Sequence, residues 1–439
     1  MTSPLAITGG RPTLDNGRHV RWPVIGDADR AAVMRVLDRG ILSGPLAPEV
    51  RGLERDFAAF VGARHCLATN SGTASLHIAL AAAGLGPGDE VVTSAYSFVA
   101  TALAVLHQDA IPVFVDIEPR FCGLDPALLE AAVTPRTRAI LPVHIHGMPC
   151  EMDPILEVAR RHDLVVIEDA CQAHGALYRG RRVGTLGSMG CFSTQSSKNL
   201  PSGEGGLFVT DDDALLERAN RTRMFGENVG SMAKAAFSPE RPLDAERSYE
   251  SEAIGFMYRT NEMSAALVRS QLERLEHYNE RARQNAQRLS ARLGALPGVG
   301  TPDADAERSG TFHKYRVRLD ARAIGVDAQP RAVRDAMLAA LRAEGLEVVL
   351  WQTLPVPGQK LFRDRVGYGG RAHPWDAGQP VDYDVSRFPE TCRLLDSSLV
   401  VFSQSCPIFP QPDEVVDAYA DAFERVWTRL PEVLGAVSR

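Results

Sequence analysis

The chain has 439 residues, of which 45% are hydrophobic and 23% charged, and its formal net charge is -7. This composition is that of a globular protein with room for one large domain and a smaller one, and the negative charge argues against a nucleic-acid-binding surface. No apolar run reaches the roughly 18 residues of a membrane span. Seven cysteines without CxxC spacing predict reduced thiols, with neither a disulfide framework nor a metal site. Because the N-terminus also lacks the apolar core of a signal peptide, we expect a cytoplasmic protein.

The first elements are an arm and two helices. Residues 1–26 are rich in turn-forming residues and predict an extended N-terminal arm that packs over another surface. Helices are expected over 27–38 and 48–61, each followed by a glycine that can end it. We expect a large domain over residues 27–270 and a smaller C-terminal domain over residues 271–439.

Short apolar runs then alternate with helical segments. Strands are expected at 66–68, 90–93, 111–115, 139–143 and 164–167, with a helix after the turn at 70–73 and further helices near 126–133 and 153–161. Strands that alternate with helices in this way predict an α/β fold with a mostly parallel sheet.

Two turns in this region offer groups that a ligand could use. Ser71, Gly72 and Thr73 open a helix, where free N–H groups, hydroxyls and the positive end of the helix dipole suit a phosphate. An ordinary helix cap is the alternative. Tyr96 and Phe98 follow the strand at 90–93, and an aromatic side chain there can stack on a flat ring or simply fill the core.

An aspartate ends the most apolar strand. Residues 164–167 are wholly apolar, as expected for a strand buried on both faces, and the strand ends in Glu168 and Asp169. A buried carboxylate requires a positive or protonated partner, and a protonated ring nitrogen would serve. A cap for the following turn is the alternative reading.

The stretch 192–206, FSTQSSKNLPSGEGG, contains Lys198, one of four lysines in a chain that otherwise uses arginine for positive charge. A lysine amine in a desolvated pocket can act as a nucleophile and form a Schiff base. The glycines at 203, 205 and 206 let the backbone approach a bulky cofactor. A solvated loop lysine is the alternative.

The C-terminal half is expected to contain a long helix over 261–293, strands at 314–319 and 346–350, and helices near 329–344 and 413–429. Residues 230–252 and 355–385 are expected to form long loops, which in compact domains are often functional. Together, a phosphate turn, an aromatic residue, an aspartate and a lysine, in this order, meet the needs of pyridoxal 5'-phosphate (PLP).

The motifs NSGTASLHIAL, GDEVVTSAYSFVAT, VIEDACQAHGA, FSTQSSKNLPSGEGG and GFMYRTNEMSAA resemble those of the DegT/DnrJ/EryC1/StrS aminotransferases, and the resemblance covers about residues 20 to 430. It implies the fold-type I architecture of PLP-dependent transferases, which is similar to aspartate aminotransferase. That architecture has a large, mostly parallel sheet domain and a smaller C-terminal α+β domain.

The resemblance also implies roles for individual residues. Lys198 would link to PLP and move the proton, and Asp169 would keep the pyridine nitrogen protonated. Phe98 would stack on the ring, and Gln172 would lie near its phenolic oxygen. The phosphate would be bound by Gly72, Thr73, Ala74, Ser193 and, from the neighbouring subunit, Arg259. The family thus implies a homodimer with shared active sites.

The substrate is left open by the resemblance. Glutamine or glutamate would donate the amino group, and Tyr96, His144 and Gln195 are candidates for contacts with the substrate. Nucleotide-sugar members commonly have a histidine where this chain has Gln195, which favours a ketocyclitol such as scyllo-inosose, or a free ketosugar, in secondary metabolism. A nucleotide-linked ketosugar, an aminohydroxybenzoate precursor, PLP-dependent dehydratase or lyase chemistry, and a catalytically silent regulator are the alternatives.

Overall fold

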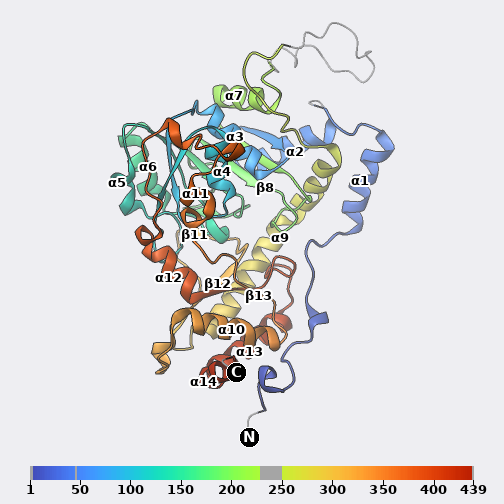
Figure 1. Ribbon diagram of the computed structural model, residues 1–439. Helices are drawn as coiled ribbons and strands as arrows, with labels where there is room; N and C mark the ends of the chain where they lie inside the picture. Colours follow the sequence, from blue (N-terminus) through green and yellow to red (C-terminus); the bar gives the residue numbers. More distant parts are fainter. Residues whose placement is uncertain (1–2, 45–46, 228–249, 438–439) are drawn as a thin grey trace.

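The computed structural model describes residues 3–44, 47–227 and 250–437, and the expected loop at 230–252 lies mostly outside this range. Its largest element is a sheet of seven strands (Figure 1). In spatial order these are β1 (His65–Thr69), β9 (Gly206–Thr210), β8 (Met189–Ser193), β5 (Val165–Asp169), β4 (Thr137–Leu141), β2 (Glu90–Ser94) and β3 (Ile111–Val115). The strands from β8 to β3 run parallel, and β9 is antiparallel to both neighbours. The predicted α/β class with a mostly parallel sheet is confirmed.

Helices cover both faces of this sheet because consecutive strand residues point to opposite sides. In β9, Phe208 packs with α3 (Gly72–Ala82), α4 (Ala100–His107) and α7 (Asp213–Arg223). Its neighbours Leu207 and Val209 pack with α2 (Pro48–Val61) and α9 (Glu262–Leu293) on the other face. Farther along that second face, α5 (Leu129–Ala132) and α6 (Met152–Arg161) cover β4 and β5.

The C-terminal part has its own core around a four-stranded sheet of β10 (Val299–Gly300), β12 (Tyr315–Leu319), β14 (Ser398–Val401) and β13 (Val348–Val349). Packed against it are the second half of α9 and α10 (Pro330–Ala343), α13 (Asp413–Trp427) and α14 (Leu430–Val437). The N-terminal arm adds Leu5, Leu14 and Trp22 to the same core, so the two termini lie at one end of the molecule (Figure 1).

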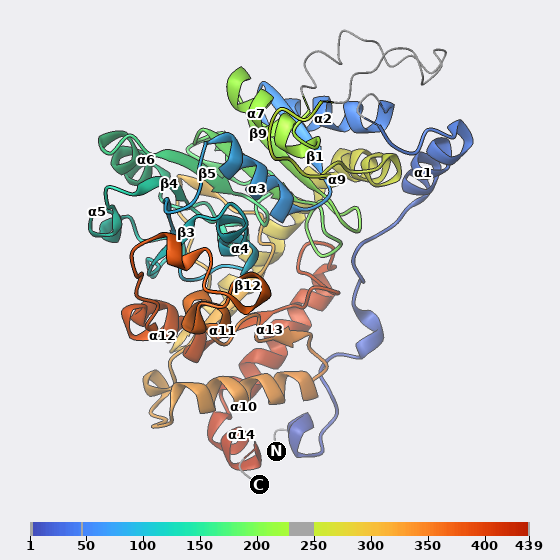
Figure 2. The ribbon, with the colours of Figure 1, turned by 45° about the horizontal axis from the view of Figure 1, so that its top comes forward.

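Two segments connect the two proposed domains, which were divided at residue 270. Helix α9 runs through it without interruption from the large-domain core into the C-terminal core. The segment 355–385, which was expected in the smaller domain, contains α11 (Lys360–Asp364). Together with Phe388, just before α12 (Pro389–Ser397), it packs on α4 and β3 of the large domain (Figure 2). The division into 27–270 and 271–439 therefore stays a prediction. Part of residues 271–439 shares a hydrophobic core with residues of 27–270.

A small third sheet joins the two parts. It pairs β11 (Arg308–Ser309) of the C-terminal half with the hairpin of β6 (Leu177–Tyr178) and β7 (Arg181–Arg182). The remaining helix, α1 (Asp27–Arg39), packs on α9 at the edge of the large domain.

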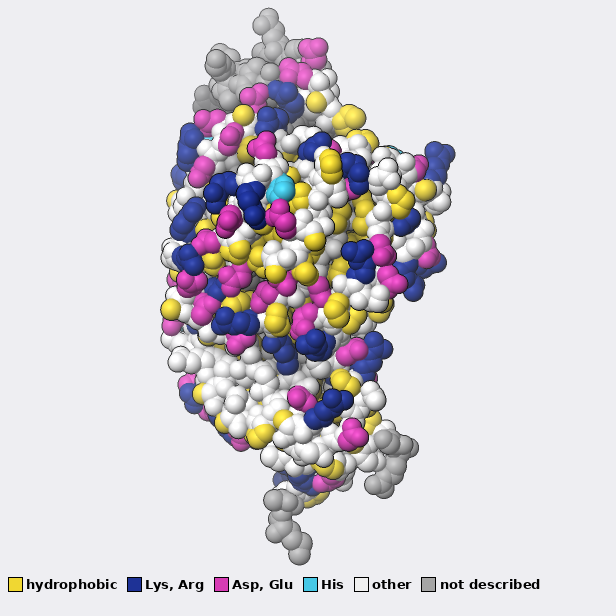
Figure 3. Space-filling model, turned by 90° about the vertical axis from the view of Figure 1, so that its left-hand side faces the viewer, with side chains coloured by type: hydrophobic (Ala, Val, Ile, Leu, Met, Phe, Trp, Pro, Cys, Tyr) yellow, Lys and Arg dark blue, Asp and Glu magenta, His cyan; other side chains and the backbone are white. Residues whose placement is uncertain are grey.

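The surface on the α5 and α6 side carries both charges interspersed (Figure 3). Arg161 and His162 of α6 both pair with Glu130 of α5, and Arg179 pairs with Asp153. Among the described residues, no helix is both apolar enough and long enough to cross a lipid bilayer.

Candidate active site

A cavity of about 380 Å³ lies where the strands β5 and β2 end. Such an edge is where open α/β sheets bind ligands. Eight of the residues predicted from the sequence line it, namely Gly72, Thr73, Phe98, Asp169, Gln172, Ser193, Gln195 and Lys198.

Lys198 lies in the loop between β8 and β9. Its backbone N–H donates to the carbonyl of Gln195 (2.8 Å), and its own carbonyl accepts a hydrogen bond from the indole Nε1 of Trp22 (3.0 Å). The N-terminal arm therefore helps to position the lysine. Burial lowers the pKa of Lys198, although the charge of Asp169 offsets part of this effect. A lowered pKa favours the neutral amine, which is the nucleophilic form.

Asp169 is 5% exposed, and hydrogen bonds fix its carboxylate. The hydroxyl of Thr101 donates to Oδ2 (2.7 Å), and the backbone N–H of Cys171 donates to Oδ1 (3.1 Å). The hydroxyl of Ser97 lies 2.6 Å from that of Thr101 and completes the chain of contacts. The sequence analysis missed Thr101, because a threonine near the start of a helix carries no signal of its own.

The turn before α3 is arranged to receive an anion. Ser71 caps the helix and accepts a hydrogen bond from the Ala74 N–H (3.1 Å), so that N–H is already used. Gly72 and Thr73 line the cavity, and N–H groups in the first turn of a helix have no intrahelical partner. A Cβ on Gly72 would lie 2.7 Å from Cβ of Ser193 and 2.9 Å from Sγ of Cys171, so only glycine fits here.

Gln195 and Gln172 line the cavity but also stabilise its walls. The side-chain oxygen of Gln195 accepts hydrogen bonds from the N–H (2.8 Å) and the hydroxyl (2.7 Å) of Ser197. Gln172 accepts from the backbone N–H of His146 (2.8 Å). Phe98 is 57% exposed and lies at the rim of the cavity.

Four of the predicted site residues, Ala74, Tyr96, His144 and Arg259, lie outside the described lining of this cavity. The buried Tyr96 hydroxyl contacts His146 Nε2 (2.6 Å). His144 Nε2 contacts Glu168 (2.9 Å) within the core. Arg259 pairs through its backbone with Thr69, beside the phosphate turn.

The C-terminal half contributes His313, Trp351 and Gln404 to the cavity wall. None of these was predicted, because they come from segments whose local pattern points to no ligand. They lie just before β12, after β13 and after β14, and only the tertiary structure brings these three segments to the cavity.

Comparison with known proteins agrees with this geometry. The profile of the DegT/DnrJ/EryC1/StrS aminotransferase family matches residues 23–376. The chain is 37% identical to L-glutamine:scyllo-inosose aminotransferase of Streptomyces griseus over 99% of this chain and 100% of that protein. It is 38% identical to dTDP-3-amino-3,4,6-trideoxy-alpha-D-glucose transaminase of Streptomyces venezuelae, over 74% of this chain and 78% of that one.

Among solved structures, the chain is similar to S. venezuelae DesV in complex with a ketimine intermediate. The TM-score is 0.74 and the identity 32%, over 92% of this chain and 99% of DesV. The predicted fold is thereby confirmed, and the chain belongs to the DegT/DnrJ/EryC1/StrS aminotransferase family.

Proposed function

We propose that the protein is a PLP-dependent aminotransferase that moves an amino group from glutamine or glutamate to the ketone of a ketocyclitol. The observation that carries this proposal is that Lys198, Asp169 and the N-terminus of α3 line a single cavity. These three features lie far apart in the sequence and correspond to three different parts of PLP.

The residues present fit this cofactor. Gly72, Thr73 and Ser193 would hold its phosphate, and Phe98 would contact its ring. The family resemblance adds Ala74 to the phosphate site, but its N–H is already bonded to Ser71. Asp169 would face the ring nitrogen and Lys198 the aldehyde. When bound, PLP supplies an electron sink for the carbon that loses or gains a proton.

The chain's own residues would do the rest of the chemistry. The Lys198 amine would move a proton at the reacting carbon, since burial favours its neutral form. The Asp169 carboxylate would keep a proton on the ring nitrogen, because a buried carboxylate stabilises an adjacent positive charge. Thr101 and the Cys171 N–H would keep that carboxylate oriented.

A ketocyclitol is the preferred acceptor. The S. griseus scyllo-inosose aminotransferase matches over the full length of both chains, and Gln195 replaces the histidine that nucleotide-sugar members commonly carry. A nucleotide-linked ketosugar is the second candidate, which the 38% identity to the dTDP-sugar transaminase supports.

We also propose a homodimer with shared active sites. Beside the phosphate turn, Asn70 donates to the carbonyl of Tyr258 (2.8 Å), so this segment borders the site. Next to it, Phe225, Ile254 and Met257 expose 45%, 87% and 51% of their surface. Exposed apolar residues that gather in this way are typical of a protein interface. Arg259 of one subunit would then reach the phosphate of the other.

The acceptor can be tested by incubating the protein with L-glutamine and either scyllo-inosose or a dTDP-linked ketosugar, and measuring the aminated product by mass spectrometry. The proposal predicts the aminocyclitol as the main product. Amination of the nucleotide-linked sugar alone would favour the second candidate, and loss of water from either substrate without amination would contradict both.

A further inference from the structure

A second, smaller cavity of about 40 Å³ borders the active cavity and is rich in cations. It lies between β12 and the loops at 120–122, 145–148 and 301–303. Its lining includes the basic residues Arg120, Lys314, Arg316 and Arg318, together with His146, against one acidic residue, Asp303. The volume suits a small group such as a carboxylate rather than a cofactor or sugar ring.

One guanidinium nitrogen of Arg316 makes no hydrogen bond to the described residues. The side chain is 6% exposed, and its Nη1 donates to the Ser398 hydroxyl (2.7 Å) while its Nε donates to His146 Nε2 (3.3 Å). Within the described part of the chain, its buried Nη2 has no hydrogen-bond acceptor. A buried donor without an acceptor is costly, so an acceptor supplied by a ligand would be favourable.

His146 adds a second such donor. Its Nε2 must accept, because the Arg316 guanidinium can only donate, so the neutral ring carries its proton on Nδ1. Burial, together with the charges of Arg316 and Lys314, lowers the pKa of His146 well below its usual value and keeps the ring neutral. Nδ1 is buried and has no partner among the residues that the structure describes.

Lys314 connects this small cavity to the active one. It is 6% exposed, and no described acceptor or carboxylate pairs with its ammonium group. Its Nζ lies 5.8 Å from the ring centre of Trp351, which lines the active cavity, as does the preceding residue His313. An anion held by Lys314 would therefore lie beside the substrate cavity.

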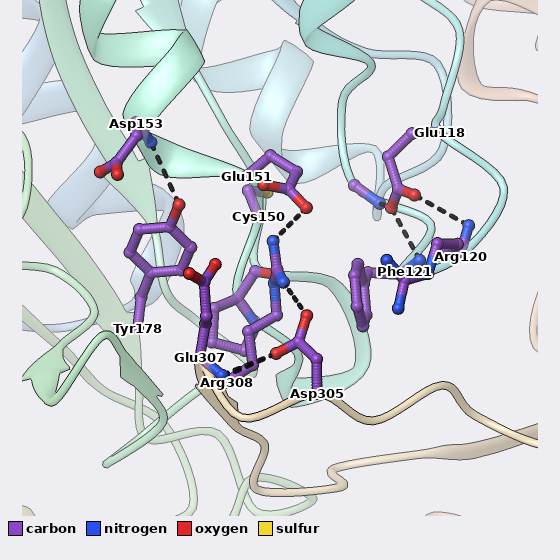
Figure 4. A network of polar contacts seen from close by, with 12 residues as sticks. Glu118, Arg120, Phe121, Cys150, Glu151, Asp153, Tyr178, Asp305, Glu307 and Arg308 are labelled. Carbon is purple, nitrogen blue, oxygen red and sulfur yellow. Dashed lines mark hydrogen bonds and ion pairs between the residues drawn. The ribbon is translucent and has the colours of Figure 1, made fainter.

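Polar contacts hold one wall of the small cavity, the segment that carries Arg120 and Phe121 (Figure 4). Arg308 forms ion pairs with Glu151 and Asp305 and stacks on Phe121, 4.0 Å from the ring centre. Glu118 accepts hydrogen bonds from the backbone N–H groups of Arg120 (2.8 Å) and Phe121 (2.7 Å). Among the proposed donors, Arg316 is itself held by Ser398 and His146, and a preorganised donor binds an anion with a smaller ordering penalty.

We propose that Lys314, Arg316 and His146 form an anion subsite that binds the carboxylate of the amino donor. The inference rests on the proposed function, because it takes the donor to be an amino acid. It accounts for the Lys314 ammonium group, the Arg316 Nη2 and the His146 Nδ1, which have no acceptor among the described residues, and for their position beside the active cavity. A free inorganic anion is the other source of the same chemistry.

Calorimetric titration of the holoenzyme with glutarate, a dicarboxylate without an amine, tests the subsite without turnover. Inorganic phosphate is titrated in parallel. Lys314→Met and Arg316→Gln should each weaken glutarate binding at least tenfold, while the exposed matched controls Lys360→Met and Arg331→Gln should bind like the wild type. Lys314→Met removes no hydrogen bond that the structure describes, so this variant should fold even if Arg316→Gln does not.

In steady-state kinetics the same two variants should raise KM for L-glutamine tenfold or more and leave KM for the ketone unchanged, whereas a general structural defect would raise both. Unchanged glutarate binding in Lys314→Met would overturn the proposal. So would binding of phosphate but not of glutarate. If the protein proved not to transfer amino groups but the variants still lost glutarate, the proposed function would fail and the subsite would stand.

Discussion

The two adjoining cavities each contain a buried lysine, but in different electrostatic surroundings. Lys198 lies near the Asp169 carboxylate, which offsets part of the effect of burial on its pKa. Among the described residues no carboxylate forms an ion pair with Lys314, and burial together with the charges of Lys198 and Arg316 lowers its pKa to about 7. The comparison indicates that the larger cavity balances charge internally, whereas the smaller one leaves positive charge for a ligand to balance.

The largest effect is expected at Lys198. Lys198→Ala should lower the turnover rate by about 10⁴-fold, because Lys198 is the lysine among the described residues of the cavity wall and would both link to the cofactor and move the proton. The melting temperature should stay near that of the wild type, since the backbone contacts of the loop are kept. Lys360→Ala, on the exposed surface, is the control. Full activity of the Lys198 variant would reject the assignment.

Asp169→Asn should slow both half-reactions by on the order of 10²-fold, because a neutral amide cannot hold the ring nitrogen protonated. Stopped-flow measurement of each half-reaction separates this from a defect in substrate binding. Thr101→Val, which removes one hydrogen bond to the carboxylate, should have a smaller effect in the same direction. Wild-type rates in Asp169→Asn would contradict the proposed role.

The stability of Lys314→Met tests whether the buried charge of Lys314 destabilises the folded protein. The folded-state pKa of Lys314 lies below its unfolded value, so the wild type is penalised at low pH and the penalty fades as the pH rises from about 7 towards 10.5. The variant should therefore be more stable than the wild type at pH 6, by about 1–3 kcal/mol, with the difference shrinking at pH 9 to 10. Urea unfolding at pH 6 and at pH 9 to 10 measures this difference in the free energy of unfolding. A difference that grew with pH would contradict the lowered pKa of Lys314.

The affinity for glutarate should follow the same titration and fall as the pH rises through 7, since binding favours the charged amine. Several charged or titratable groups face Lys314 or line its cavity, namely Lys198, Arg316, His313, His146, Asp303, Arg120 and Arg318. The control is Lys314→Met, whose weaker binding should lose this pH dependence. A wild-type affinity independent of pH between 6 and 9 would contradict the account.

The smallest effect is expected at Trp22. Trp22→Phe keeps the aromatic packing but removes the hydrogen bond to the Lys198 carbonyl, so stability should fall by about 0.5–1.5 kcal/mol. Thermal unfolding measures the change. The rate should fall only modestly, because the side chain of Lys198 is untouched. Full wild-type stability in this variant would mean that the arm does not help to hold the lysine loop.

The sequence predicted what depends on local pattern. The expected helices at 48–61 and 261–293 match α2 and α9 closely, because apolar residues recur on one face of each. Residues 72, 73, 169 and 198 were found because each stands in a turn or at a strand end. Their common cavity follows from the parallel strand order, which places the ends of β2, β4 and β5 at one edge.

What depends on distant packing was not predictable. Arg316 and Lys314 belong to a strand that was predicted, but nothing in KYRVRL shows that both charges are buried, Lys314 near Trp351 and Arg316 near Tyr96. The segment at 355–385 was expected to be a loop of the smaller domain, yet Phe362 and Trp375 pack on the large domain. Such contacts join segments more than 200 residues apart and leave no periodic signal.

The most direct test of the central claim is the absorption spectrum of the purified protein before and after addition of L-glutamine. The account predicts a yellow protein whose colour is lost with L-glutamine and restored by the ketone that accepts the amino group. A colourless protein that cannot take up PLP would contradict the roles given to Lys198 and Asp169.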